Sequence, residues 1–202
     1  MKYKYLLLAL IVSLAACKSD DDDSEFYPNI VTEFALLRTD ASGTMTELIT
    51  DDNKTYTISN PQEGYDKNVQ YRVVCGFVPD GQTATLYQIT AANMLRDSTS
   101  LAFEPDATDV VSAWQSGHFI NMQLSPLTQG GTQYWGYRID GISPGSMHIS
   151  LHHRQNGDPL SYTQTVYASI ATDDFDLVPK GGYITLHVKT FKGDRTWTFQ
   201  KP

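Results

Sequence analysis

The sequence predicts an all-β protein in which a small closed barrel is followed by an antiparallel β-sandwich. Short segments with alternating apolar and polar residues recur along the chain, as expected for strands that bury one face. Gly, Pro, Asn and Asp cluster between these segments and favour turns, because Pro presets φ and Gly accepts a positive φ. A polar, turn-rich stretch at 97–106 divides the strands into an earlier and a later group.

The chain starts with a bacterial lipoprotein signal rather than a strand. Lys2 and Lys4 precede the apolar segment 5–14, which is about half of the roughly 20 apolar residues that span a bilayer. Small residues then lead to Cys17. We therefore expect cleavage after residue 16 and attachment of acyl chains, including palmitate, to Cys17 as a membrane anchor. The alternative is a secreted protein with a chance cysteine at the cleavage site.

An acidic linker, 17–28, follows the predicted lipidated cysteine. Its like charges repel one another and keep the chain extended and solvated. The run also resembles the export signal of surface-exposed lipoproteins of Bacteroidetes, which implies an outer-membrane protein on the cell surface, with a periplasm-facing lipoprotein as the alternative. The run consists of Lys18, Ser19, Asp20, Asp21, Asp22 and Asp23.

The region 29–98 predicts a five-stranded barrel of the OB type, since closure removes the exposed sheet edges that short strands would otherwise present. Cys75 lies in the apolar run 71–78, which favours a small buried hydrophobe over a catalytic thiol. The segment 91–96 is the one short helical candidate. The expected strands are 31–38, 45–50, 55–58, 70–78 and 83–90.

The stretch 97–106 is predicted to be a linker between two compact units. Within it, the tripeptide Asp97-Ser98-Thr99 resembles an O-glycosylation motif of Bacteroidetes envelope proteins, with Ser98 as the acceptor.

The region 99–202 predicts the β-sandwich, because seven or so alternating segments are separated by hairpin and loop chemistry. The expected strands are 110–114, 119–124, 133–139, 147–154, 161–170, 183–191 and 195–200.

Two patterns invite a catalytic or metal interpretation. Gly141-Ile142-Ser143-Pro144-Gly145 matches the hydrolase nucleophile elbow, but the elbow needs a helix after the serine and a strand is predicted there. His148 and His152 share one face of a predicted strand but lie about 13 Å apart along it, too far to bind one metal ion. His118 or His187, from another part of the chain, could complete a site. We expect a polar outer face opposite Ile149 and Leu151, and neither metal nor cofactor.

Aromatic residues offer a further candidate binding feature. Trp135 and Tyr137 share the apolar face of their predicted strand with Ile139 and are expected in the core, whereas Tyr134 faces the other way. Exposed Tyr and Trp favour recognition of sugars and proteins. The candidate ligand contacts are therefore Tyr134, together with His148 and His152.

The chain resembles the NigD-like lipoproteins over nearly its whole length. This resemblance implies an OB-like domain followed by a β-sandwich, and the family's name reflects a proposed role in bacteriocin immunity with no catalytic residues to carry over. It is carried by the leader with its acidic tail and by the segments 50–58, 110–122, 151–158 and 174–177.

These features predict a non-enzymatic envelope protein that acts by binding. The net charge of −8, about −10 once Lys2 and Lys4 leave with the leader, disfavours nucleic acid, whose phosphates need Lys and Arg. A protein toxin and a glycan both remain as partners. A hydrolase or metalloenzyme is the remaining alternative, and it would need a cleft joining Ser143 or several histidines to a carboxylate.

Overall fold

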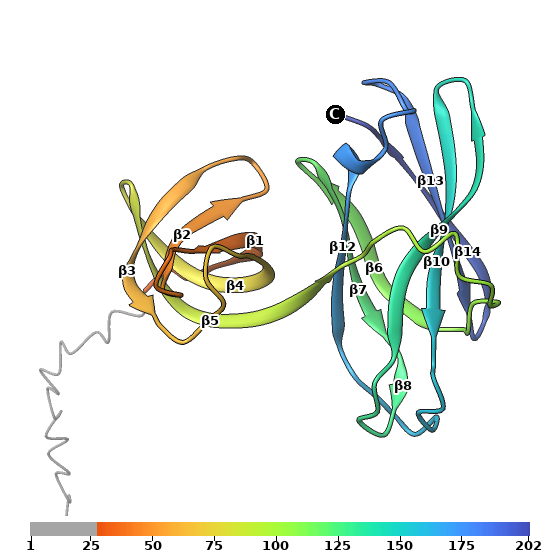
Figure 1. Cartoon of the computed structure of the whole chain (residues 1–202), viewed down its shortest axis with the longest axis horizontal. Coiled ribbons are helices and arrows are strands. Elements are labelled where there is room, and N and C mark those ends of the chain that lie inside the picture. The colour runs from red at the N-terminus through yellow and green to blue at the C-terminus, as the bar shows by residue number, and fades with distance from the viewer. Residues whose placement is uncertain (1–27) are drawn as a thin grey trace, which may run out of the picture.

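The computed structural model describes residues 28–202 and shows an all-β chain of two units joined by a long strand (Figure 1). The predicted lipidation at Cys17 and the acidic run 18–23 lie outside the described residues. Within residues 28–202, no helix is long and apolar enough to cross a membrane.

Five strands form the barrel: β1 (Val31–Thr39), β2 (Met45–Thr50), β3 (Thr55–Gln62), β4 (Gln70–Asp80) and β5 (Thr83–Met94). They run in the order β3-β2-β1-β4-β5, and a parallel pairing between β3 and β5 closes the circle. Alternate residues of each strand point inward, so Leu37, Leu48, Cys75 and Phe77 share one core. The sequence therefore predicted both the OB-type barrel and the burial of Cys75 correctly.

Strand β5 continues beyond the barrel into the second unit. Its residues Ala92–Met94 pair in parallel with β12 (Val166–Ala171), which makes one continuous eight-stranded sheet. The helix considered at 91–96 is therefore wrong. The reason is tertiary, since β12 is about 70 residues away in sequence and supplies ladder hydrogen bonds that outweigh a weak local helix propensity.

The second unit is a sandwich of two sheets around its own apolar core. The first sheet continues from β5 through β12 and β7 to β6, and the second has the order β14-β13-β10-β9. Ile120, Met122, Leu151 and Leu186 are fully or almost fully buried between the sheets. The remaining elements are β6 (Asp109–Ser116), β7 (Phe119–Ser125), β8 (Leu127–Thr128), β9 (Tyr134–Ser143), β10 (Ser146–Arg154), β11 (Tyr162–Thr163), the 3₁₀ turn η1 (Thr172–Asp174), β13 (Tyr183–Thr190) and β14 (Gly193–Gln200).

The sequence predicted a wholly antiparallel sandwich, and this prediction is wrong for one pair of strands. Strands β10 and β13 pair in parallel. Parallel neighbours need a crossover connection of a dozen or more residues, and the chain between Arg154 and Tyr183 provides one. Alternation within a strand determines its buried face but not the direction of its partner, so the pattern could not show this pairing.

The polar stretch 97–106 is not a free linker. Its backbone joins the second sheet, where Ser98 N donates to Tyr137 O at 2.8 Å and Asp106 N donates to His153 O at 2.9 Å. Leu95, just before it, is 1% exposed in the sandwich core. The stretch therefore lies on the sandwich as an outer covering, and this placement alters the candidate site described below.

A buried carboxylate organises the loops at the β8 end of the sandwich. Asp158 Oδ1 accepts the backbone N–H of Gln129 at 2.9 Å and of Gly131 at 3.1 Å, and Oδ2 accepts from Thr128 Oγ1 and Gln133 Nε2. These bonds, led by the Thr128 hydroxyl, lower the pKa of Asp158 to about 2.

We therefore expect Asp158→Asn to lower the melting temperature at pH 7. A carboxyl whose folded pKa is depressed stabilises the fold above its unfolded pKa, near 3.8, and loses that contribution as the pH falls toward 2. Thermal melts followed by circular dichroism should show the difference from wild type shrinking between pH ~4 and pH ~2. The exposed Asp80→Asn is the control, and a pH-independent difference for Asp158→Asn would contradict the assignment.

Candidate functional site

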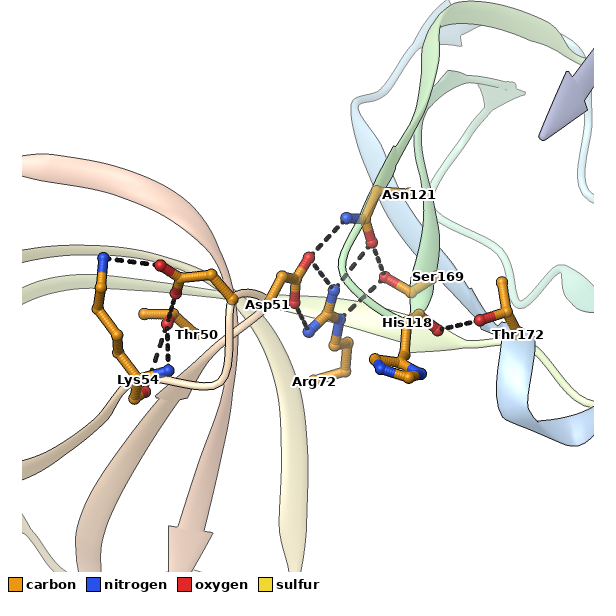
Figure 2. A network of polar contacts seen from close by, with 9 residues as sticks. Thr50, Asp51, Lys54, Arg72, His118, Asn121, Ser169 and Thr172 are labelled. Atoms are coloured by element: carbon orange, nitrogen blue, oxygen red, sulfur yellow. Dashed lines mark hydrogen bonds and ion pairs between the residues drawn. The ribbon is translucent and has the colours of Figure 1, made fainter. Parts of the chain in front are cut away.

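A buried polar network joins the barrel to the sandwich (Figure 2). Arg72 on β4 makes two hydrogen bonds to Asp51, from its NH1 at 2.6 Å and its NH2 at 2.9 Å. The same guanidinium donates to Asn121 Oδ1 on β7 at 2.9 Å and to Ser169 Oγ on β12 at 3.0 Å. Asn121 Nδ2 closes the network by donating to Asp51 at 2.8 Å.

The network is buried but electrically balanced. The Arg72 and Asp51 side chains are only 1% and 4% exposed, and the guanidinium stacks 3.9 Å from the centre of the Phe119 ring. Burying a charge is costly unless it is paired and hydrogen-bonded, and this planar, two-point pairing meets both conditions. Because its four members come from both units, the network holds barrel and sandwich in one arrangement.

Two turns meet beside this network. Gly117, in the β6–β7 turn, has a φ of +51°, and a Cβ at this position would lie 1.8 Å from the carbonyl oxygen of Asp51. Two hydrogen bonds from Thr172 hold the β6–β7 turn in place: His118 O accepts from Thr172 N at 2.8 Å and from Thr172 Oγ1 at 3.0 Å. Only glycine permits such a close approach of the two units.

A cleft of about 320 Å³ opens between barrel and sandwich next to the network. The barrel contributes Thr32, Glu33, Phe34, Asp51 and Val74 to its lining. The sandwich contributes Trp114, Ser116, Asn121 and Tyr167. Ligand-binding sites often lie at such junctions between two units, where apolar walls surround a few polar groups.

Three aromatic rings form the apolar part of this cleft. Phe34 is 5% exposed and meets Trp114 edge to face at 5.4 Å and Tyr167 at 5.7 Å between ring centres. Trp114 itself is 37% exposed, so part of its ring is open to solvent. Because these rings are already held in place by one another, a ligand that packs on them would cost little side-chain entropy.

Glu33 borders the cleft, but its register opposite Cys75 places its side chain on the inward face of β1, away from Phe34. Burial raises the pKa of Glu33, and the neighbouring carboxylates of Asp52 and Asp51 raise it further, while Lys54 acts in the opposite direction. Among residues 28–202, no side chain or backbone group hydrogen-bonds or ion-pairs with this carboxylate by the usual distance criteria. The cleft therefore combines aromatic faces with the polar residues Asp51, Ser116 and Asn121.

The residues predicted from the sequence as ligand contacts lie elsewhere, on the second sheet. Tyr134 is 36% exposed and stays available. His152 faces outward as predicted but is fully buried, because the segment after β5 covers it: Phe103 stacks on its ring at 3.8 Å. Its two ring nitrogens lie 2.7 Å from Ser98 Oγ and 3.0 Å from Phe103 O. Contrary to the prediction, His152 cannot reach a ligand in this arrangement.

The same covering changes the prediction for Ser98. This residue is 2% exposed, and its hydroxyl donates to Tyr137 O at 2.8 Å. The folded protein therefore does not present Ser98 for O-glycosylation. The tripeptide motif describes only local sequence, whereas burial depends on the sheet beneath.

His148 meets His187 from the neighbouring strand β13. His148 Nδ1 and His187 Nε2 are 3.2 Å apart, and both side chains are near the surface. Over the part of the chain that the structure describes, no group of three His, Cys, Asp or Glu side chains comes together in a way that could hold a metal ion. The pair is a hydrogen-bonded contact across parallel strands.

The hydrolase pattern and the Cys75 thiol have structural roles. Ser143 ends β9 and lies opposite Ser146 in a tight hairpin, so a strand follows the motif, as the sequence predicted. Cys75 is fully buried, and burial, assisted by Glu33, raises the pKa of its thiol to about 12. A thiol with such a pKa stays protonated at neutral pH and is a poor nucleophile.

The residues of the network and of the cleft are not among those that the sequence patterns predicted. Arg72 carried a usable signal, since a charged residue inside the apolar run 71–78 needs a partner when it is buried. Asn121, between Ile120 and Met122, has the pattern of an outward polar position on an alternating strand. It does point outward from the sandwich core, but toward the barrel. Its partner Asp51 is 70 positions away, so no local pattern could reveal the contact.

The fold and this cleft define a class of protein: a two-part, all-β chain in which an OB-type barrel is docked on a β-sandwich. No protein-family model matches the chain, and the search of curated proteins finds no match. Solved structures do match. One is a NigD-like immunity protein from Bacteroides caccae, at 22% identity and a TM-score of 0.67, covering 88% of this chain and 100% of that one.

Two further solved structures share the fold. A candidate toxin-related protein from Parabacteroides distasonis is 13% identical with a TM-score of 0.64, covering 85% of this chain and 93% of the other. A candidate lipoprotein from Bacteroides fragilis is 9% identical with a TM-score of 0.62, covering 87% and 99%. At these identities the likeness shows the fold. It confirms the predicted resemblance to NigD-like proteins at that level.

Proposed function

We propose that this protein is a lipid-anchored, non-enzymatic envelope protein that binds a protein toxin at the cell surface. The observation that carries the proposal is the lipid-attachment sequence ending at Cys17, placed ahead of a fold shared with a NigD-like immunity protein. The likeness to a candidate toxin-related protein and to a candidate lipoprotein supports the same interpretation.

The junction between barrel and sandwich suits a binding role. The Arg72 network and the close contact at Gly117 restrain the two units, so the cleft exists before any partner arrives. A preformed site loses less conformational entropy on binding than one that must be assembled. A partner large enough to contact both units would meet a single rigid surface.

The acidic linker provides the test of location. We expect protease added to intact cells to digest the wild-type protein and to spare a variant with alanine at Asp20, Asp21, Asp22 and Asp23, because the charged run directs export. A known periplasmic lipoprotein is the control for outer-membrane integrity, and a Cys17→Ser variant tests the anchor by membrane fractionation. Protection of the wild-type protein would contradict the surface location and leave the run as a plain linker.

A glycan-binding accessory lipoprotein is the second candidate function. The observation that favours it is the half-exposed Trp114 ring beside Phe34 and Tyr167, since sugar rings stack on aromatic faces. Titration with neutral oligosaccharides, followed through the Trp114 indole resonance, tests it.

A further inference from the structure

We infer that the cleft between barrel and sandwich binds one neutral sugar ring, the pyranose at the end of a glycan chain. Phe34, Trp114 and Tyr167 supply the apolar surface, and hydroxyl groups beside them supply the hydrogen bonds. The inference rests on the glycan-binding function, the second candidate above, and assigns it a site, a class of sugar and a number of rings.

The aromatic rings and the hydroxyl groups of the cleft face the same side. On β1, Thr32 and Phe34 are two residues apart and share one face of the strand. On β6, Trp114 and Ser116 share a face for the same reason. Phe34 meets both Trp114 and Tyr167 edge to face, so the two faces look toward each other across the junction. A single ligand in the cleft can therefore contact rings and hydroxyls together.

The described lining residues offer hydrogen bonds to the cleft without an uncompensated charge. The Asp51 carboxylate is paired with Arg72 and also accepts from Asn121, and the Glu33 side chain lies on the inward face of β1. The bonds within the network leave out three hydroxyl groups of the lining, those of Thr32, Ser116 and Tyr167. A hydroxyl both donates and accepts, so it can pair with a sugar hydroxyl in either direction.

The rings form a surface on which a sugar can stack. Trp114 and Tyr167 stand nearly perpendicular to Phe34, at 78° and 86°, and Phe34 is only 5% exposed between them. Trp114 is 37% exposed, so part of its ring stays open to a ligand. A pyranose has an apolar side of C–H groups and a rim of hydroxyls, which matches an aromatic ring bordered by hydroxyl groups.

The size of the cleft and the charge of the chain narrow the class of sugar. A volume of about 320 Å³ is at the lower end of ligand pockets, so it suits one ring with the rest of the glycan in solvent. The net charge of −8 repels acidic sugars. An acidic sugar would also bring into the cleft a charge that no described lining residue compensates. We therefore expect a neutral ring to bind best.

The test uses the full-length protein in a non-ionic detergent without a sugar headgroup. The probes are the methyl glycosides of glucose, galactose, mannose and N-acetylglucosamine. Methyl glucuronide is the matched acid, and sorbitol is a polyol without a ring. Saturation-transfer NMR measures binding, and the Trp114 indole N–H, one of three such signals, locates it. Its disappearance in Trp114→Leu assigns that signal.

We expect at least one neutral glycoside to bind and to shift the Trp114 signal. Methyl glucuronide and sorbitol should bind at least about five-fold more weakly than that glycoside, because the first carries a charge and the second cannot stack.

Three variants separate the contributions of ring and hydroxyls. Trp114→Leu should weaken the bound glycoside at least about five-fold. Tyr167→Phe and Ser116→Ala each remove one hydroxyl and should weaken it about three- to ten-fold. Tyr183→Phe, an exposed tyrosine on the second sheet, is the control and should change nothing. Circular dichroism verifies folding, and Tyr167→Phe keeps the inference testable if Trp114→Leu does not fold.

The inference is overturned if sorbitol or the glucuronide binds as well as the best neutral glycoside, or if the folded variants bind as wild type does. A sugar that binds without shifting the Trp114 signal would also overturn it, while the glycan function would stand with another site. Binding of oligosaccharides but of no single glycoside would have the same meaning. If neither binds, the glycan function fails as well. Surface location is measured separately on intact cells.

Discussion

Replacing Arg72 with methionine is expected to lower the free energy of unfolding by about 3–5 kcal/mol, the usual cost of breaking a buried ion pair from one side. Methionine fills much of the space but leaves the Asp51 carboxylate, 4% exposed, without its cation. Chemical denaturation measures the loss. Limited proteolysis of the native state should reveal faster cleavage near the junction, because the same side chain joins both units.

The second partner provides the internal check. In the double variant Arg72→Met/Asp51→Asn no buried charge is left unpaired, so its loss should be smaller than the sum of the two single losses. Arg38→Met is the matched control, because Arg38 and Glu47 form an exposed pair whose removal should cost less than about 1 kcal/mol. Additive single losses would show that the pair does not act as a unit.

Gly117→Ala is expected to destabilise the protein more than any other glycine-to-alanine change in a turn of similar backbone conformation. The left-handed backbone alone costs an alanine roughly 1–2 kcal/mol. At Gly117 the new methyl group would also lie 1.8 Å from Asp51 O, and overpacking adds about 1–3 kcal/mol as the two turns move apart. The measurement is the unfolding free energy, with the shape of the molecule followed by small-angle scattering.

Gly81→Ala is the matched control for this prediction. Gly81 has a similar φ of +59°, but no atom lies within 4 Å of the position its Cβ would take. It should therefore show only the backbone cost. Equal losses at Gly81 and Gly117 would mean that the two turns are not in firm contact, and the cleft beside them would then not be preformed.

Local patterns predicted the strands well, and the failures have a common origin. The alternation at 55–58 and 119–124 placed β3 and β7 correctly, because a strand at the surface of a core needs one apolar face. The continuation of β5 into the second unit and the parallel pairing of β10 with β13 were missed. Both depend on which distant strand supplies the hydrogen bonds. The apolar–polar alternation within a strand does not identify that neighbouring strand.

The candidate site shows the same division more sharply. The sequence directed attention to His152 and Ser98, since polar residues on an outer strand face are usually accessible. The segment 97–106 folds over them, and they satisfy each other's hydrogen bonds instead.

By itself, the sequence determined the all-β class, the position of most strands and turns, the burial of Cys75, and the prediction of a lipid anchor at Cys17. These depend on spacing, local conformational preference and hydrophobicity within a few residues. Only the tertiary structure decided that Arg72 neutralises Asp51 and bonds Asn121 across the junction. Charge compensation acts over a few ångströms in space between residues far apart in the chain, so it becomes visible only after barrel and sandwich have docked.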